Sequence, residues 1–136
     1  MNAIASWWSA RQPELRSALR IVAAAMFMLA GSSKLLAFPI GMPPNGQTAT
    51  FGSQVWVGGA LELVGGGLML VGLFSRPVAF VLSGEMAVAY FQFHQPQAFW
   101  PTVNGGVAAV VYCFLWLYVS AAGPGPWSVD ARRLSS

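Results

Sequence analysis

Residues 55–70 read VWVGGALELVGGGLML, an apolar run with a single carboxylate, Glu62, near its centre. The chain has only four acidic residues, and an ionisable group is costly in lipid, so we expect Glu62 to face other helices. On a helix, the positions three and four residues away share the face of Glu62. All four of these positions are glycine: Gly58, Gly59, Gly65 and Gly66. Either a neighbouring helix approaches this bare backbone, or a flat ligand lies against it in a glycine-lined pocket, and both interpretations stay open.

The composition of the 136-residue chain is typical of a membrane protein. It is 56% hydrophobic and 8% charged, whereas roughly 25% of residues are charged in an ordinary soluble domain. The net charge of +3 comes from few, scattered basic residues beside apolar runs, so we expect a lipid bilayer and no nucleic acid as partner. Cys113 is the sole cysteine and the chain has one histidine, so we expect neither an intrachain disulfide nor a metal site.

Four apolar stretches are long enough to be membrane spans, and each is bounded by proline, glycine or polar residues. They cover about residues 19–38, 51–74, 77–93 and 104–122, which together form one transmembrane domain, residues 19–122. We take the first stretch as an anchor and not as a cleaved signal peptide, because further spans follow it. Residues 1–18, with Trp7 and Trp8, are expected to be an interfacial N-terminal segment, and residues 123–136 a C-terminal tail.

The loop charges predict the orientation of these spans. The loops at residues 39–50 and 95–103 contain no Lys or Arg. The basic residues outside the middle of the spans all fall on the opposite side: Arg11, Arg16, Arg20, Arg76, Arg132 and Arg133. The positive-inside rule therefore places both termini in the cytoplasm. The predicted fold is all-α, an antiparallel transmembrane four-helix bundle.

Once the arginines at the loops and span ends are accounted for, three charged residues remain inside the predicted spans: Lys34, Glu62 and Glu85. Counted from the cytoplasmic ends, they share a middle-to-outer layer of the bundle. We expect Lys34 to reach Glu62, and Glu85 to reach one of these two. Because two carboxylates face one ammonium, one carboxylate is expected to hold its proton. The alternative to a ligand or proton site is a purely structural ion pair that fixes the helix register.

Three further polar residues are candidates for the same site. Gln92 follows Glu85 by seven positions and therefore lies nearly on its face. His94 follows Glu85 by nine, so it joins the pocket only if the helix ends or bends before it, and otherwise lies in an interfacial loop. Asn104, in the sequence VNGG, is expected to be the N-cap of the fourth span, with a place at the pocket mouth as a second role.

Four motifs in this order resemble the DoxX family of small bacterial four-span membrane proteins. They are GSSKLL at residues 31–36, LELVGGGLMLVGLFSRP at 61–77, NGG at 104–106 and GPGPWSVDARR at 123–133. The resemblance implies a bundle in the bacterial cytoplasmic (inner) membrane, with Lys34, Glu62 and Asn104 as polar positions of the family type. It further implies a link to quinone-reducing oxidoreductases and redox partners, and a closing segment in which Asp130 caps a helix or pairs with Arg132 or Arg133.

The residues and the resemblance together favour a quinone-like ligand. A quinone is flat, apolar and lipid-borne, and its carbonyl oxygens need hydrogen bonds that Lys34, Glu62 and Glu85 can supply. The chain has no evident haem, flavin or metal signature, so a redox role requires a redox partner protein. Two alternatives remain, a non-enzymatic binder or transporter of a lipid-like or aromatic compound and a structural membrane partner, and a homo-oligomer is left open.

Overall fold

The computed structural model describes residues 2–136. The described residues are helical and contain no β-strand, which confirms the predicted all-α class. In chain order the elements are α1 (Ala3–Ser9), α2 (Gln12–Leu36), α3 (Gln54–Val71), α4 (Ser75–Ala89), the π-helix η1 (Tyr90–His94), α5 (Pro101–Asn104), α6 (Val107–Ala122) and α7 (Val129–Leu134).

Two of the helices, α2 and α3, are long and apolar enough to cross a membrane. Helix α6 is also apolar but shorter. Helix α4 continues directly into η1, so residues 75–94 form one uninterrupted helical stretch. The helices differ from the expected spans at two points. Helix α2 begins at Gln12, inside the segment expected to be interfacial. Helix α6 begins at Val107, three residues after the expected start of the fourth span, and the separate short helix α5 ends at Asn104.

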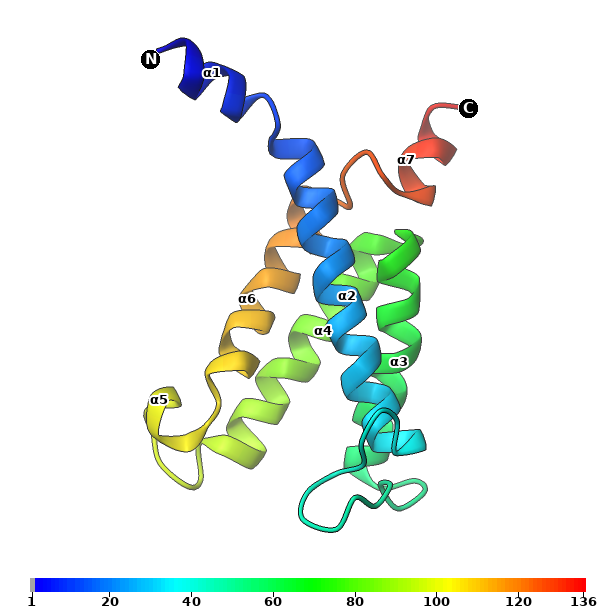
Figure 1. Ribbon diagram of the computed structural model, residues 1–136, viewed down its shortest axis with the longest axis vertical. Helices are drawn as coiled ribbons and strands as arrows, with labels where there is room; N and C mark the ends of the chain where they lie inside the picture. The colour runs from blue at the N-terminus through cyan, green and yellow to red at the C-terminus, as the bar shows by residue number, and fades with distance from the viewer. Residues whose placement is uncertain (1) are drawn as a thin grey trace.

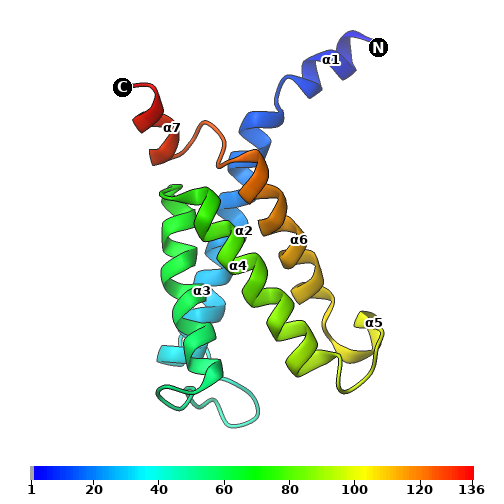
Figure 2. The same cartoon turned by 180° about the vertical axis from the view of Figure 1, so that it is seen from behind.

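The four longer helices form two closely packed pairs. Helix α2 packs along α3, α4 packs along α6, and α3 and α4 join the pairs (Figure 1). The pairs converge at the end of the molecule where both chain termini lie, and they diverge toward the other end, as Figure 2 also shows. The backbones of the two pairs are therefore furthest apart at the end distant from the termini.

Glycine allows the α2–α3 pair to pack backbone against backbone. A Cβ atom on Gly31 of α2 would lie 2.6 Å from both the carbonyl oxygen of Gly59 and the amide nitrogen of Leu63 on α3. A Cβ atom on Gly66 would come within 2.9 Å of the Met28 side chain. Small residues at helix contacts permit such close approach in membrane proteins. The glycines of α3 are therefore in large part a packing surface.

A buried arginine fastens the converging ends of the helices. Arg20 on α2 has no exposed surface. Its guanidinium group donates to the carbonyl oxygens of Met69 and Leu70 at the end of α3, and to those of Pro124 and Trp127 in the segment before α7. From the sequence, Arg20 was expected only to help set the orientation of the spans in the membrane. The structure adds that Arg20 is an internal cross-link, satisfied by backbone carbonyls that helix ends leave free.

The closing segment is a second fastening at the same end. The Asp130 carboxylate accepts hydrogen bonds from the backbone amides of Phe74 (3.0 Å) and Ser75 (2.8 Å) at the start of α4. The resemblance implied that Asp130 caps a helix or pairs with Arg132 or Arg133, and in the structure it caps α4. Gly125, with φ of +82°, lies against α2, where a Cβ atom would come within 2.2 Å of the Ser17 hydroxyl. Residues 123–130 thus tie α2, α3 and α4 together.

Candidate ligand cleft

A cleft of about 720 Å³ lies between the two helix pairs. Its walls come from α2, α3, α4, η1 and α6, and most of the lining side chains are apolar, including Phe27, Leu61, Met86 and Tyr112. The polar side chains that line it are Lys34, Gln54, Glu62, Glu85 and His94. A mostly apolar cavity with a few convergent polar groups is the usual form of a small-molecule site.

Lys34 and Glu62 form an ion pair in this cleft. The Lys34 ammonium donates to both carboxylate oxygens of Glu62, each at 2.6 Å. The Glu62 side chain is 5% exposed and that of Lys34 is 29% exposed. Glu62 is therefore the buried member, and Lys34, in the last turn of α2, reaches it from the margin. The predicted contact between the two residues is present.

Glu85 lies in the cleft with unused hydrogen-bonding capacity. Its Oε2 atom is buried and has no hydrogen-bond partner among residues 2–136. Its Oε1 atom lies 3.3 Å from the place where a Cβ on Gly58 would be, and Lys34 and Glu62 are the charged groups that act on it. A buried oxygen without a partner is rare in folded proteins, and a ligand group is one of the ways to satisfy it.

The four glycines around Glu62 have different neighbours. Only Gly58 lines the cleft, opposite Glu85. Gly59 and Gly66 are covered by α2, since a Cβ on Gly59 would lie 2.9 Å from that of Lys34. Gly65 is covered by Leu82 of α4. The expectation of a glycine-lined pocket therefore holds for one glycine, and helix packing occupies the space at the other three.

The π-helix explains how His94 reaches the cleft. An ordinary α-helix would point His94 away from Glu85, but η1 has the wider i→i+5 turn, which slows the rotation of successive side chains. His94 accordingly lines the cleft, with Nδ1 3.1 Å from the carbonyl oxygen of Asn104. This contact leaves the second ring nitrogen for a ligand. His94 was expected either to join the pocket after a break in the helix or to lie in an interfacial loop. In the structure the helix changes from α to π at Tyr90, and His94 lines the cleft.

Gln92 lies beside the cleft and does not line it. Its side-chain oxygen accepts a hydrogen bond from the amide of Gln54, which is the first residue of α3. This contact connects the two diverging helix pairs near the end distant from the termini. The role of Gln92 in the structure is therefore to bridge α3 and η1.

Asn104 is buried but lies outside the cleft lining, and the expectation that it caps the fourth span is wrong. It is the last residue of α5, and Gly106 is the N-cap of α6. Its side-chain oxygen accepts from the Gly106 amide at 2.7 Å, and its amide group donates to the Ala98 carbonyl at 2.7 Å. The local VNGG pattern resembles a cap because the side chain holds the turn that precedes the helix.

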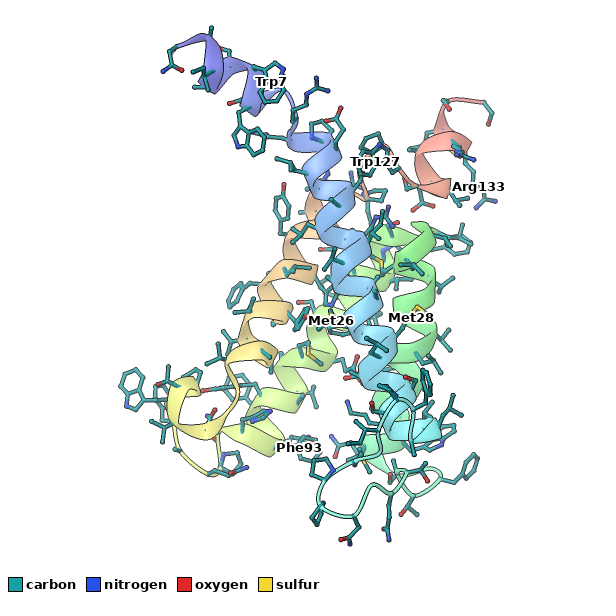
Figure 3. The ribbon with its side chains drawn as sticks, in the orientation of Figure 1. Trp7, Met26, Met28, Phe93, Trp127 and Arg133 are labelled. Carbon is teal, nitrogen blue, oxygen red and sulfur yellow. The ribbon has the colours of Figure 1, made fainter. Side chains whose placement is uncertain are left out.

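The cleft reaches the lateral surface of the molecule. Several wall residues have large exposed fractions, among them Met26 (52%), Val57 (46%) and Val81 (50%). These three side chains come from α2, α3 and α4, so apolar surface from three helices borders the opening. Figure 3 shows Met26 directed toward this space from α2, and Phe93 at its far end. The cleft is therefore open on the side of the molecule.

Sequence reasoning missed the aromatic part of the site. Phe27 and Tyr112 line the cleft and meet edge to face, with ring centroids 4.9 Å apart. Phe27 also contacts the fully buried Trp116 in the same geometry, at 5.3 Å. The sequence carries no signal for this contact, because aromatic residues occur throughout the spans and the partner helices are set only by tertiary packing. Gln54, which also lines the cleft, was missed as well, although a polar residue at the start of an apolar run could have marked it as a candidate.

Known proteins resemble the chain over most of its length. A Haemophilus influenzae protein (strain ATCC 51907 / DSM 11121 / KW20 / Rd), described as an uncharacterized protein, is 43% identical over 124 residues, which is 89% of this chain and 92% of that protein. No solved protein structure matches the chain. The DoxX family matches residues 15–95, more than half of the chain, a range that includes Lys34, Glu62 and Glu85. The chain therefore belongs to the DoxX family and is an integral membrane protein.

Proposed function

We propose that this protein binds a quinone-like molecule in the cleft between its helix pairs, as a membrane subunit or accessory of a quinone-linked redox system. The observation that carries the proposal is the combination of apolar walls open to lipid with buried charged groups at the back of the cleft. A soluble metabolite has no need of a lateral apolar entrance. A lipid-borne ring with polar oxygens needs both parts.

The proposed membrane arrangement has four spans, α2, α3, α4 with η1, and α6, which cross the bacterial inner membrane in alternating directions. Both termini then lie in the cytoplasm. Two facts support this orientation: the termini share one end of the molecule, and the loop at residues 39–50 at the other end has no Lys or Arg. In this arrangement the cleft lies in the outer half of the bilayer.

The chemistry of the cleft fits a quinone ring. The apolar walls and the edge-to-face aromatic side chains Phe27 and Tyr112 suit a flat ring and its isoprenoid tail. Glu85 and His94 offer hydrogen-bonding groups to ring oxygens, and the Lys34–Glu62 pair supplies fixed charge beside them. When bound, a quinone supplies two-electron chemistry. The electrons would come from a partner protein, while these residues hold the ring and exchange protons.

The test is mass spectrometry of small molecules extracted from the gently purified full-length protein, combined with thermal unfolding after adding ubiquinone or menaquinone. A co-purifying quinone and a raised unfolding temperature are expected. In Glu85→Gln the rise in unfolding temperature should shrink. Glu14→Gln is the matched control, because it is the same chemical change at the end remote from the cleft and should leave the rise unchanged.

Other results would overturn the quinone assignment. If extraction yields no quinone and added quinone leaves the unfolding temperature unchanged, the polar residues serve only to fix the helices. If a different lipophilic compound co-purifies and depends on Glu85, the protein is a non-enzymatic binder or transporter. The lateral opening is the observation that favours this second candidate, since it allows exchange with the bilayer without any redox partner.

A further inference from the structure

We propose that the end of the molecule carrying the termini has a binding surface for the headgroups of anionic phospholipids. This surface, here called the terminal collar, consists of Trp7, Trp8, Arg16, Arg132 and Arg133. It lies at the end where α2 and α3 meet α7, remote from the ligand cleft (Figure 1). It is independent of what the cleft binds.

Helix α1 contributes an apolar face that is largely exposed within residues 2–136, with the Arg11 guanidinium 5.4 Å from the centroid of the Trp7 ring. Ile4, Trp7 and Trp8 follow the i, i+3, i+4 pattern of one helix face and are 78%, 58% and 56% exposed. The two tryptophan rings stack with centroids 5.9 Å apart. Helix α1 has no buried residue and projects from the helix pairs (Figure 1). Tryptophan prefers the headgroup region of a bilayer, so this face fits a membrane surface.

The arginines of the collar lack partners that the other arginines have. Arg20 and Arg76 donate to backbone carbonyls, and Arg11 pairs with Glu14 at 3.9 Å. Within residues 2–136, by contrast, the salt bridges include none to Arg16, Arg132 or Arg133. The Nε atom of Arg16 is buried and has no hydrogen-bond partner. A buried guanidinium nitrogen without an acceptor is rare in folded proteins, and a bound anion is one of the ways to satisfy it.

Neither of the two acidic residues near the collar forms a salt bridge with its arginines within residues 2–136. Glu14 is paired with Arg11, and the Asp130 carboxylate is occupied by the start of α4. The Arg133 guanidinium lies over the Phe74 ring, 5.8 Å from its centroid, and this contact positions its charge at the start of α4. Figure 3 shows Arg133 on α7 and Trp7 on α1 at the same end of the molecule as Trp127.

A phosphodiester is the anion that fits this arrangement. Guanidinium groups bind phosphate through paired N–H donors, and tryptophan rings lie at the depth where phospholipid headgroups occur. Basic residues next to a membrane add attraction for anionic lipid that salt screens. The collar therefore selects anionic phospholipid over zwitterionic phospholipid in the leaflet next to it.

The test uses the full-length protein reconstituted in phosphatidylcholine vesicles that contain some brominated phosphatidylglycerol, or brominated phosphatidylcholine in a parallel sample. Bromine quenches tryptophan fluorescence on contact. Stronger quenching by the anionic lipid is expected for the natural sequence, and added sodium chloride should weaken the difference. In the triple variant Arg16→Gln, Arg132→Gln, Arg133→Gln the preference should fall by about fivefold for each arginine neutralised.

The matched control is the triple lysine variant Arg16→Lys, Arg132→Lys, Arg133→Lys, which keeps the charge and should keep most of the preference. Equal quenching by the two lipids in the natural protein would overturn the proposal. So would an unchanged preference in the folded glutamine variant. Inorganic phosphate at millimolar concentration should leave the quenching unchanged, and displacement of the lipid by it would assign the collar to free phosphate instead. If the glutamine variant does not fold, the salt dependence of the natural protein decides.

Discussion

Gly31 on α2 and Gly59 on α3 are in backbone contact, so close that a Cβ atom on Gly31 would lie 2.6 Å from the Gly59 carbonyl oxygen. This contact brings α2 near enough to α3 for Lys34, one turn further along, to reach both oxygens of Glu62. The glycine pattern and the ion pair are thus two parts of one helix interface. A substitution at these glycines should therefore move Lys34 away from Glu62.

Gly31→Ala should destabilise the protein by about 1–3 kcal/mol, because the new methyl group meets backbone atoms that cannot rotate away. Thermal unfolding in detergent measures the effect. Gly67→Ala in α3 is the control, since a Cβ there meets nothing within 4 Å, and better helix propensity should leave it neutral or slightly more stable. Equal unfolding temperatures for the two variants would contradict the close helix contact.

Lys34→Met should lower the free energy of unfolding by about 3–5 kcal/mol, because it leaves the buried Glu62 carboxylate without its cation. Adding Glu62→Leu removes the stranded charge and should recover most of the loss. Chemical denaturation of the single and double variants gives the coupling energy between the two residues. If the double variant is no more stable than Lys34→Met alone, the ion pair does not govern stability.

Arg20→Lys should destabilise the protein by about 3 kcal/mol although it keeps the positive charge, since an ammonium cannot donate to four separated carbonyl oxygens. Limited proteolysis should then cut the segment at residues 123–128 faster. Arg76→Lys is the comparison, because Arg76 is exposed where it donates to the Ser120 and Ala121 carbonyls, and a change under about 1 kcal/mol is expected. Similar effects from the two substitutions would argue against Arg20 as the internal cross-link.

Asp130 should make stability depend on pH in the acid range. Partial burial tends to raise the pKa of Asp130, but the amides of Ser75 and Phe74 and the charge of Arg133 outweigh it and hold the pKa below the usual 3.8. A lowered folded-state pKa means that the carboxylate stabilises the fold fully above pH 3.8 and loses this effect as the pH falls toward the folded-state value.

The variant Asp130→Asn isolates this contribution. Its unfolding temperature should lie below that of the natural protein at pH 7. The difference should shrink as the pH falls from 3.8 toward the lower folded-state pKa, below which the natural residue is protonated in the folded protein as well. The pH dependence of the difference between the two proteins removes the effect of the other acids. A difference that is constant from neutral to acid pH would show that the charge of Asp130 is not what caps α4.

The sequence was sufficient for the helical class and for the main contact of the site. Long apolar runs predict helices, and the depth of each charged residue predicts that Lys34 meets Glu62. The sequence was insufficient for features that depend on tertiary packing. The burial of Arg20 depends on carbonyl groups, which every residue carries and no motif marks. The π-turn that brings His94 to the cleft, and the division between α5 and α6 at Asn104, likewise have no signature in residue types.

The acceptors of Arg20 have a consequence for the order of assembly. Met69 and Leu70 follow Arg20 by about fifty positions, and Pro124 and Trp127 by more than a hundred. During synthesis α2 leaves the ribosome with a guanidinium whose last partner, Trp127, is translated only after all four of the longer helices. Until then the guanidinium lacks the Trp127 carbonyl group from its set of four acceptors. Completion of the C-terminal segment, rather than insertion of any one helix, is therefore the event that fixes the bundle.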